Sequence, residues 1–114
     1  MKMVRNFASK LRNRIEIFTN IAEGDIGFEN WVKCLDLYAE ILSITENNIK
    51  EFDSINFGHI MSEEYYIITF RYVENINYKM RIKFGNRIFL IKKIINPYEQ
   101  NRYLKVIALE ITEK

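Results

Sequence analysis

The second half of the chain alternates between apolar and polar residues with the two-residue period of β-strands. Four segments there are also rich in the β-branched and aromatic side chains of half-buried strands, namely residues 64–72, 79–84, 87–95 and 103–111. Gly85-Asn86 separates the second segment from the third, and both residues tolerate the positive φ of a two-residue hairpin turn. Asn96-Pro97 ends the third segment, because proline cannot donate to a ladder. The pattern predicts three or four consecutive antiparallel strands.

The first half of the chain has a weaker pattern. Residues 11–18 alternate as a strand does, and residues 22–27 have the composition of a turn or loop. In residues 28–42 the apolar positions fall at helical spacing, which by pattern alone favours a helix. An alternating pattern also fits this segment, with Lys33 as the exception. Residues 45–63 show no sustained period, so we expect a long connection that is mobile in the isolated subunit; such loops are often functional.

The composition fits one domain with one hydrophobic core. The 114 residues are 48% hydrophobic and 14% aromatic, which excludes an intrinsically disordered chain. The single cysteine cannot form an internal disulfide, which is typical of a reducing cytoplasm. The start lacks the apolar run of a secretory signal, and no segment has the eighteen apolar residues of a membrane span. We therefore expect a soluble protein made in the cytoplasm, with residues 1–10 as an N-terminal extension and residues 11–114 as the domain.

The charges are segregated along the chain, although the net charge is only +2. Residues 1–14 hold five bases and no acid, residues 15–78 hold twelve acids and three bases, and residues 79–105 hold eight bases and one acid. Two interpretations fit this pattern. The simpler one is that the charges lie on solvated strand faces and pair across the sheet. The other is a subunit that meets its neighbours, or a polyanion, through a basic surface.

A search for catalytic chemistry finds little. The four glycines are too scattered to form a phosphate-binding loop, and His59, the only histidine, provides no His pair for a metal. A Cys34–His59 dyad is arithmetically possible but has no supporting signature. Cys34 stands in an apolar run, so we expect a buried core thiol. The sequence therefore predicts no enzyme, no cofactor and no metal site.

Five segments together resemble the phage head–tail joining proteins, also called head-closure or stopper proteins. Their opening strand resembles Leu-Arg-Asn-Arg-Ile-Glu-Ile at residues 11–17, and their second strand resembles Trp31 followed by Tyr-Ala-Glu-Ile at residues 38–41. Residues 66–72 resemble the family's strand that ends in Arg-Tyr. Residues 80–91 resemble a Met-Arg strand, a Gly-x-Arg turn and a Phe-x-Ile strand in succession. Residues 96–104 resemble the family's Asn-Pro-acidic-x-x-Arg loop, which leads into the last strand. The resemblance covers roughly residues 11–111. Two departures are a longer N-terminal extension and a loop at 46–62 without the family's small, Ala-rich stretch.

The resemblance implies a mainly all-β fold, a small antiparallel β-barrel with a long loop between its second and third strands. Residues 28–42 would then be a long bent strand instead of a helix, and the N-terminal extension has room for a short helix. Family members are structural virion proteins of tailed phages or prophages, made in the host bacterial cytoplasm and located at the head–tail junction. They form a ring, usually dodecameric, that closes the head after DNA packaging and provides the tail-docking surface.

The resemblance also implies partners and candidate residues. The partners are the portal and adaptor ring, the tail terminator, further copies of the chain and, without sequence specificity, the packaged DNA; no membrane is involved. We expect a monomer in isolation. The candidate gating or partner loop comprises Glu46, Asn47, Asn48, Ile49, Lys50, Glu51, Phe52 and Asp53. The candidate ring-interface or channel-facing basic residues are Lys79, Arg81, Lys83, Arg87 and Arg102.

A small β-barrel nucleic-acid-binding module is the alternative. Lys79, Arg81 and Lys83 alternate along one segment, so we expect one outward row that could track phosphates. Tyr65 or Tyr72 would then stack on bases. This alternative requires the aromatic rings to lie exposed beside the basic row, whereas such rings more often pack in a core.

Overall fold

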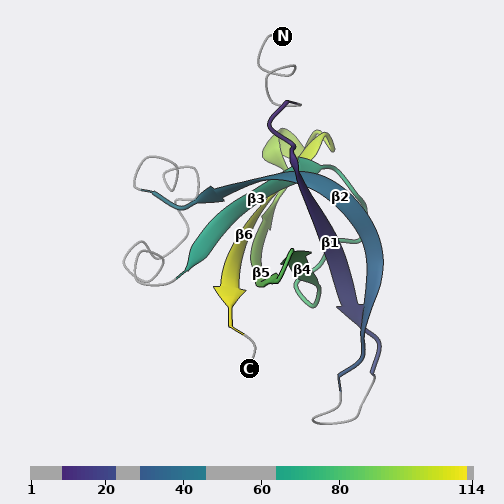
Figure 1. The fold of residues 1–114 in the computed structure, drawn as a ribbon. Coiled ribbons are helices and arrows are strands. Elements are labelled where there is room, and N and C mark those ends of the chain that lie inside the picture. Colours follow the sequence, from purple (N-terminus) through teal and green to yellow (C-terminus); the bar gives the residue numbers. More distant parts are fainter. Residues whose placement is uncertain (1–8, 23–28, 46–63, 113–114) are drawn as a thin grey trace.

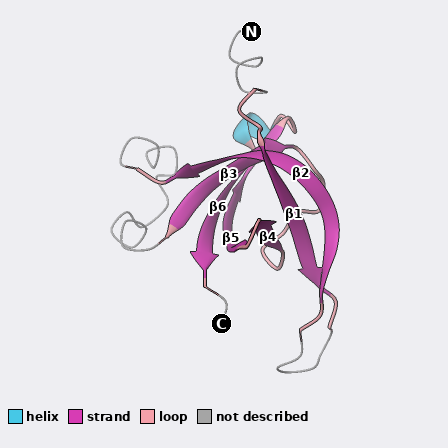
Figure 2. Cartoon of the chain, in the orientation of Figure 1, coloured by secondary structure: helices cyan, strands magenta, loops and turns pink. Residues whose placement is uncertain are grey.

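The chain forms a closed barrel of six antiparallel strands, seen in a computed structural model that describes residues 9–22, 29–45 and 64–112 (Figure 1). The strands are β1 (Asn13–Asn20), β2 (Trp31–Ser43), β3 (Tyr65–Arg71), β4 (Arg81–Phe84), β5 (Arg87–Ile95) and β6 (Tyr103–Ile111). Around the barrel they follow the order β1-β2-β3-β6-β5-β4. One short 3-10 helix, η1 (Pro97–Glu99), lies among the described residues, between β5 and β6 (Figure 2). The expected β-barrel is confirmed.

The barrel closes where β1 pairs with β4. This ladder joins residues that are far apart in sequence, with Glu16 opposite Lys83 and Phe18 opposite Arg81. Closure pairs the two end strands of the order with each other instead of leaving both as edge strands. The inner positions of all six strands then form one core, which includes the fully buried side chains of Ile15, Ile17, Ile68, Phe70, Ile82, Phe89 and Val106.

The helix expected from the spacing in residues 28–42 is wrong, and the bent strand implied by the resemblance is confirmed. β2 is 13 residues long and curves over the barrel (Figure 1). Its register against β1 shifts, because Ile17 lies opposite Leu35 whereas Phe18 lies opposite Lys33. Cys34 is therefore the extra residue of a β-bulge, and the alternation of β2 changes phase there. This phase change explains why Lys33 is the exception in the alternating pattern.

The predicted boundaries of β5 and β6 are confirmed, and those of β1, β3 and β4 differ by one or two residues. β2 begins three residues after the start of the expected segment and ends one residue after its end. The turn between β4 and β5 is the expected two-residue hairpin, since Phe84 lies opposite Arg87. Gly85 has a φ of 61°, and of the two turn residues only this glycine has a positive φ. That pattern fits a type II′ turn, which needs glycine at its first central position.

The N-terminal helix that the extension had room for is not supported. Residues 9 and 10 form a turn before β1, and residues 1–8 lie outside the described residues. A hydrogen bond from Arg12 Nε to the Ser9 carbonyl, at 2.8 Å, lies next to this turn. Residues 11 and 12 then lead into β1 without forming a helix.

An ion pair lies on the inner face beside the β4–β5 hairpin. Arg87 Nε donates to Glu110 Oε2 at 3.0 Å, and Arg87 Nη2 donates to Glu110 Oε1 at 3.1 Å. The guanidinium carbon is 5.0 Å from the ring centre of Tyr66 and 5.1 Å from that of Phe89, and these two rings meet edge to face. The hydrogen bond from Arg87 lowers the pKa of the Glu110 carboxyl. A paired carboxylate and two aromatic rings thus close this part of the barrel interior.

We predict that Glu110→Gln lowers the free energy of unfolding by about 1 kcal/mol at neutral pH, because both partners keep some solvent exposure. The folded-state pKa of Glu110 is lowered, so its stabilisation is present above the unfolded-state pKa and is lost as pH falls through the folded-state value. Urea denaturation should therefore show a gap between wild type and variant at neutral pH that narrows in acid. Glu74→Gln, at an exposed position, is the control. A gap that is independent of pH would contradict the ionic contribution.

Candidate protein-interaction site

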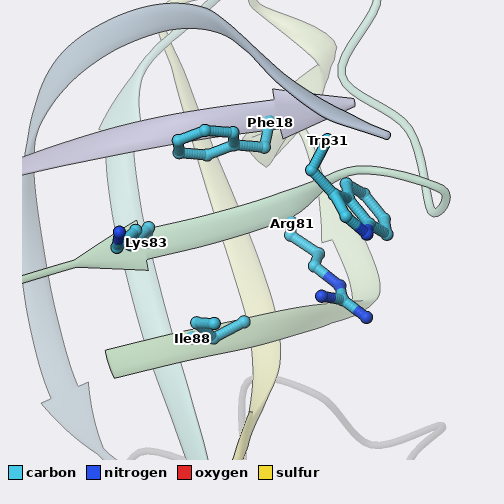
Figure 3. A pocket seen from close by; sticks show the side chains of 5 residues that line it. All are labelled: Phe18, Trp31, Arg81, Lys83 and Ile88. Carbon is cyan, nitrogen blue, oxygen red and sulfur yellow. The ribbon is translucent and has the colours of Figure 1, made fainter. Parts of the chain in front are cut away.

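A small pocket lies on the outer face of the barrel, where β1, β2, β4 and β5 meet. It has a volume of about 170 Å³ and is lined by Phe18, Trp31, Arg81, Lys83 and Ile88 (Figure 3). Pockets for small molecules and cofactors usually enclose about 300–1,000 Å³. The space is therefore suited to one or two side chains of another protein.

Strand alternation places the two cations of the pocket on the outside. Ile82 is fully buried in the barrel, so its neighbours Arg81 and Lys83 point outwards. The register then sets their surroundings, with Phe18 opposite Arg81 on β1 and Ile88 opposite Lys83 on β5. Two positive charges thus lie beside three apolar or aromatic side chains.

Trp31 reaches the outer face because of the bulge at Cys34. With the phase of β2 changed, Trp31 and Lys33 share the outward side, and the guanidinium of Arg81 lies 4.1 Å from the Trp31 ring centre (Figure 3). This distance is that of a cation–π contact. The indole Nε1 donates to Glu29 Oε1 at 3.0 Å. The tryptophan is therefore held from two directions and forms a rigid wall of the pocket.

A network of ion pairs lies on the neighbouring outer surface of β1 and β2. Lys33 Nζ is 3.4 Å from Glu16 Oε2 and 3.3 Å from Asp36 Oδ2, and Arg14 is 3.1 Å from Asp36 Oδ1. The hydrogen bond with Asp36 is the main reason why the pKa of Lys33 is raised. These pairs are solvent-exposed and contribute little to stability. Their effect is to balance charge beside the pocket, so Arg81 and Lys83 define its positive character.

The five predicted basic residues do not form one surface. Arg81 and Lys83 meet at the pocket, while Lys79 lies in the turn before β4 and outside the strand row that the sequence predicted. Arg87 pairs with Glu110 on the inner face. Arg102 is exposed in the β5–β6 connection, where its carbonyl accepts a hydrogen bond from the Tyr72 amide. The roles of these residues stay predictions.

The candidate gating loop, Glu46 to Asp53, lies outside the described residues, as does His59. Sequence analysis did not identify Phe18, Trp31 and Ile88 as a site. The irregular position of Lys33 in the alternating pattern was the available signal, because it marks the phase change that turns Trp31 outwards.

The aromatic rings that the nucleic-acid alternative needs have packing roles. Tyr72 packs against the barrel core, and Tyr65 packs against a second small cluster formed by Ile67 and Ile107. Both tyrosines are half-buried. Neither lines the pocket with Arg81 and Lys83. The stacking platform expected for that alternative is therefore not the arrangement observed.

The expectation that Cys34 is a buried core thiol is wrong. As the bulge residue of β2, Cys34 faces solvent, and its nearest hydrogen-bond partner is the Val32 carbonyl at 3.9 Å. Within residues 9–22, 29–45 and 64–112, no cluster of three His, Cys, Asp or Glu side chains could hold a metal ion. In those same segments no helix is long and apolar enough to cross a membrane.

The described residues thus form a small closed antiparallel barrel with an aromatic and cationic pocket on its outside. The sequence model of phage head completion proteins matches residues 8–111. The chain therefore belongs to the phage head completion protein family and is a structural protein of the phage head, located in the virion. A search of curated proteins finds no match.

Two solved structures share the fold. The solution structure of a protein from Shigella flexneri 2a is 23% identical, has a TM-score of 0.68, and aligns over 92% of this chain and 96% of its own. A chain from the virion of a native gene transfer agent particle is 16% identical, has a TM-score of 0.63, and aligns over 90% of this chain and 97% of its own. Both likenesses span nearly the whole barrel.

We predict that Cys34 reacts with a maleimide under native conditions at nearly the rate seen in denaturant, because its thiol is exposed. Mass spectrometry of quenched time points measures the rate. Cys34→Ser should take up no label, since the chain has one cysteine. Native labelling slower than denatured labelling by two orders of magnitude or more would contradict the outward position of the bulge.

Proposed function

We propose that the chain forms a ring below the portal and adaptor that closes the head after DNA packaging and provides the surface on which the tail docks. The observation that carries the proposal is the match to phage head completion proteins along residues 8–111, which contain every strand of the barrel. The similar fold of a chain from a gene transfer agent virion supports the same setting. In this proposal the tail terminator is the partner on the far side of the ring.

The barrel itself supports a role as a ring subunit that meets its partners through its outer surface. The large apolar side chains with no exposure, such as Phe70 and Phe89, are buried within one chain and need no second copy to cover them. Obligate oligomers, by contrast, usually have extensive apolar interfaces. In the proposed ring, contacts of this barrel with its neighbours would be polar in part, as at Arg81 and Lys83.

The basic residues would serve the neighbours or the channel DNA. Contacts with DNA in the channel would be unspecific, because phosphate contacts carry no sequence information. The segment between β2 and β3, which includes residues 46–53, is the candidate for contact with the adjoining ring.

We predict that the purified protein is mainly monomeric at micromolar concentration and assembles only when a portal–adaptor complex provides the template. A template raises the local concentration of subunits, so weak pairwise contacts add up. Size-exclusion chromatography with light scattering should give the monomer mass alone, and a ring bound to the complex after mixing.

The matched control is a portal complex without its adaptor, which should not recruit the barrel. A stable ring formed without any template, or no binding to a cognate portal–adaptor complex, would contradict the proposed function.

A further inference from the structure

The β5–β6 connection presents an aromatic ring and a carboxylate together. Tyr98 is 91% exposed, and Glu99 beside it is also exposed. Both have the left-handed backbone conformation, with φ of 55° and 52°, as does Asn101 with φ of 57°. Such angles are costly for residues other than glycine and persist where the surroundings impose them.

The turn is held by hydrogen bonds that begin at Asn96. The Glu99 amide donates to the Asn96 carbonyl at 2.8 Å, and the Asn101 amide donates to Asn96 Oδ1 at 3.1 Å. The side chains of Asn96 and Asn101 also meet at 2.6 Å. Proline at position 97 further restricts the backbone. The protein thus maintains a strained turn whose large aromatic side chain points to solvent, which stability alone does not explain.

The pocket on the other part of the barrel matches this turn in chemistry. Its apolar and aromatic walls, Phe18, Trp31 and Ile88, suit a tyrosine ring, and its cations, Arg81 and Lys83, suit a carboxylate. Aromatic side chains that enter a pocket are frequent anchors of protein interfaces, and charge-assisted hydrogen bonds to carboxylates are among the stronger ones.

A single molecule cannot bring the two features together. η1, cyan in Figure 2, lies at the top beside the start of β1. The end of β1 and the start of β2, which carry Phe18 and Trp31 of the pocket, lie at the lower part of the same view. Two different surfaces that are complementary give a head-to-tail contact between copies, and such contacts form rings when the rotation closes.

We propose that Tyr98 and Glu99 of one copy dock into the Phe18–Trp31–Arg81–Lys83–Ile88 pocket of a second copy. The inference rests on the proposed ring, and it specifies which surfaces join adjacent subunits. Two side chains in a small pocket bury far less than the ~1,600 Å² of a standard interface. The contact is therefore weak between free copies and becomes effective when many copies are held side by side.

Charge reversal at each side of the contact tests the proposal. Lys83→Glu changes the pocket without removing the stacking of Arg81 on Trp31, and Glu99→Lys changes the turn. Each variant alone should self-associate about tenfold more weakly, because like charges then meet. An equimolar mixture of the two, and the double variant, should regain association, since each reversed pocket can then receive a reversed turn.

Two measurements report the contact directly on the full chain. Sedimentation equilibrium at increasing concentration gives the association constant. Trp31 is the only tryptophan, so its fluorescence should shift to shorter wavelength as Tyr98 of another copy covers it. Lys92→Glu and Glu74→Lys make the same charge changes at exposed positions outside the contact and should behave as wild type.

The outcomes separate this inference from the proposed function. Restored association in the mixture, with restored ring formation on portal–adaptor complexes, supports the contact. Wild-type ring formation by both single variants would overturn the contact and leave the proposed ring intact. Absence of wild-type binding to the portal–adaptor complex would count against the ring itself, whatever Trp31 reports. Equal weakening by the control variants would also overturn the contact, because it would reflect net charge alone.

Discussion

The pairing of β1 with β4 closes the sheet, and the remaining features of the molecule depend on it. β1, which has eight residues, pairs with β2 on one side and with β4 on the other. The ladder with β4 joins the two ends of the strand order. Closure gives the sheet an inner face, which packs into one continuous core, and an outer face, which carries the alternate residues of each strand. A flat sheet of the same strands would leave two edges open to unplanned pairing. The closed barrel instead pairs these two end strands, β1 and β4, with each other.

The bulge at Cys34 changes which side chains β2 presents on the outside of the barrel. A bulge increases the local bend and twist of a strand, and the bulge in β2 lies near its start, before β2 curves over the barrel. The extra residue also reverses which side chains face outwards before it. Trp31 is thereby moved to the outer face, where Arg81 from β4 stacks on it. One inserted residue thus both shapes the barrel and builds a wall of the pocket.

Much of the fold could be predicted from the sequence, and two of the errors, at β2 and at Cys34, have a common cause. β5 and β6 were located to the residue because clear alternation is bounded there by Gly85-Asn86 and Asn96-Pro97, which are strong local signals. β2 was misread as a helix by pattern because the bulge breaks its alternation, and the same bulge brings Cys34 to solvent. The pocket could not be predicted, because it depends on which strands become neighbours when the barrel closes. Only the resemblance to the head–tail joining proteins, which implies a whole barrel and not a local pattern, indicated that β2 is a bent strand.

The arrangement of charged side chains can determine which surfaces of two proteins meet, even where the interface is small. Arg87 is paired with Glu110 inside the barrel, and Lys33 is paired with Glu16 and Asp36 outside it. Two of these ion pairs, Arg87–Glu110 and Lys33–Glu16, join neighbouring strands, and Lys33–Asp36 lies within β2. The pocket carries two cations, Arg81 and Lys83, and η1 carries the carboxylate of Glu99. Complementary charges of this kind determine which surfaces meet and in what orientation more than how tightly they bind. Under the proposed function, a subunit that stays single until a template is present needs this combination of specific and weak contacts.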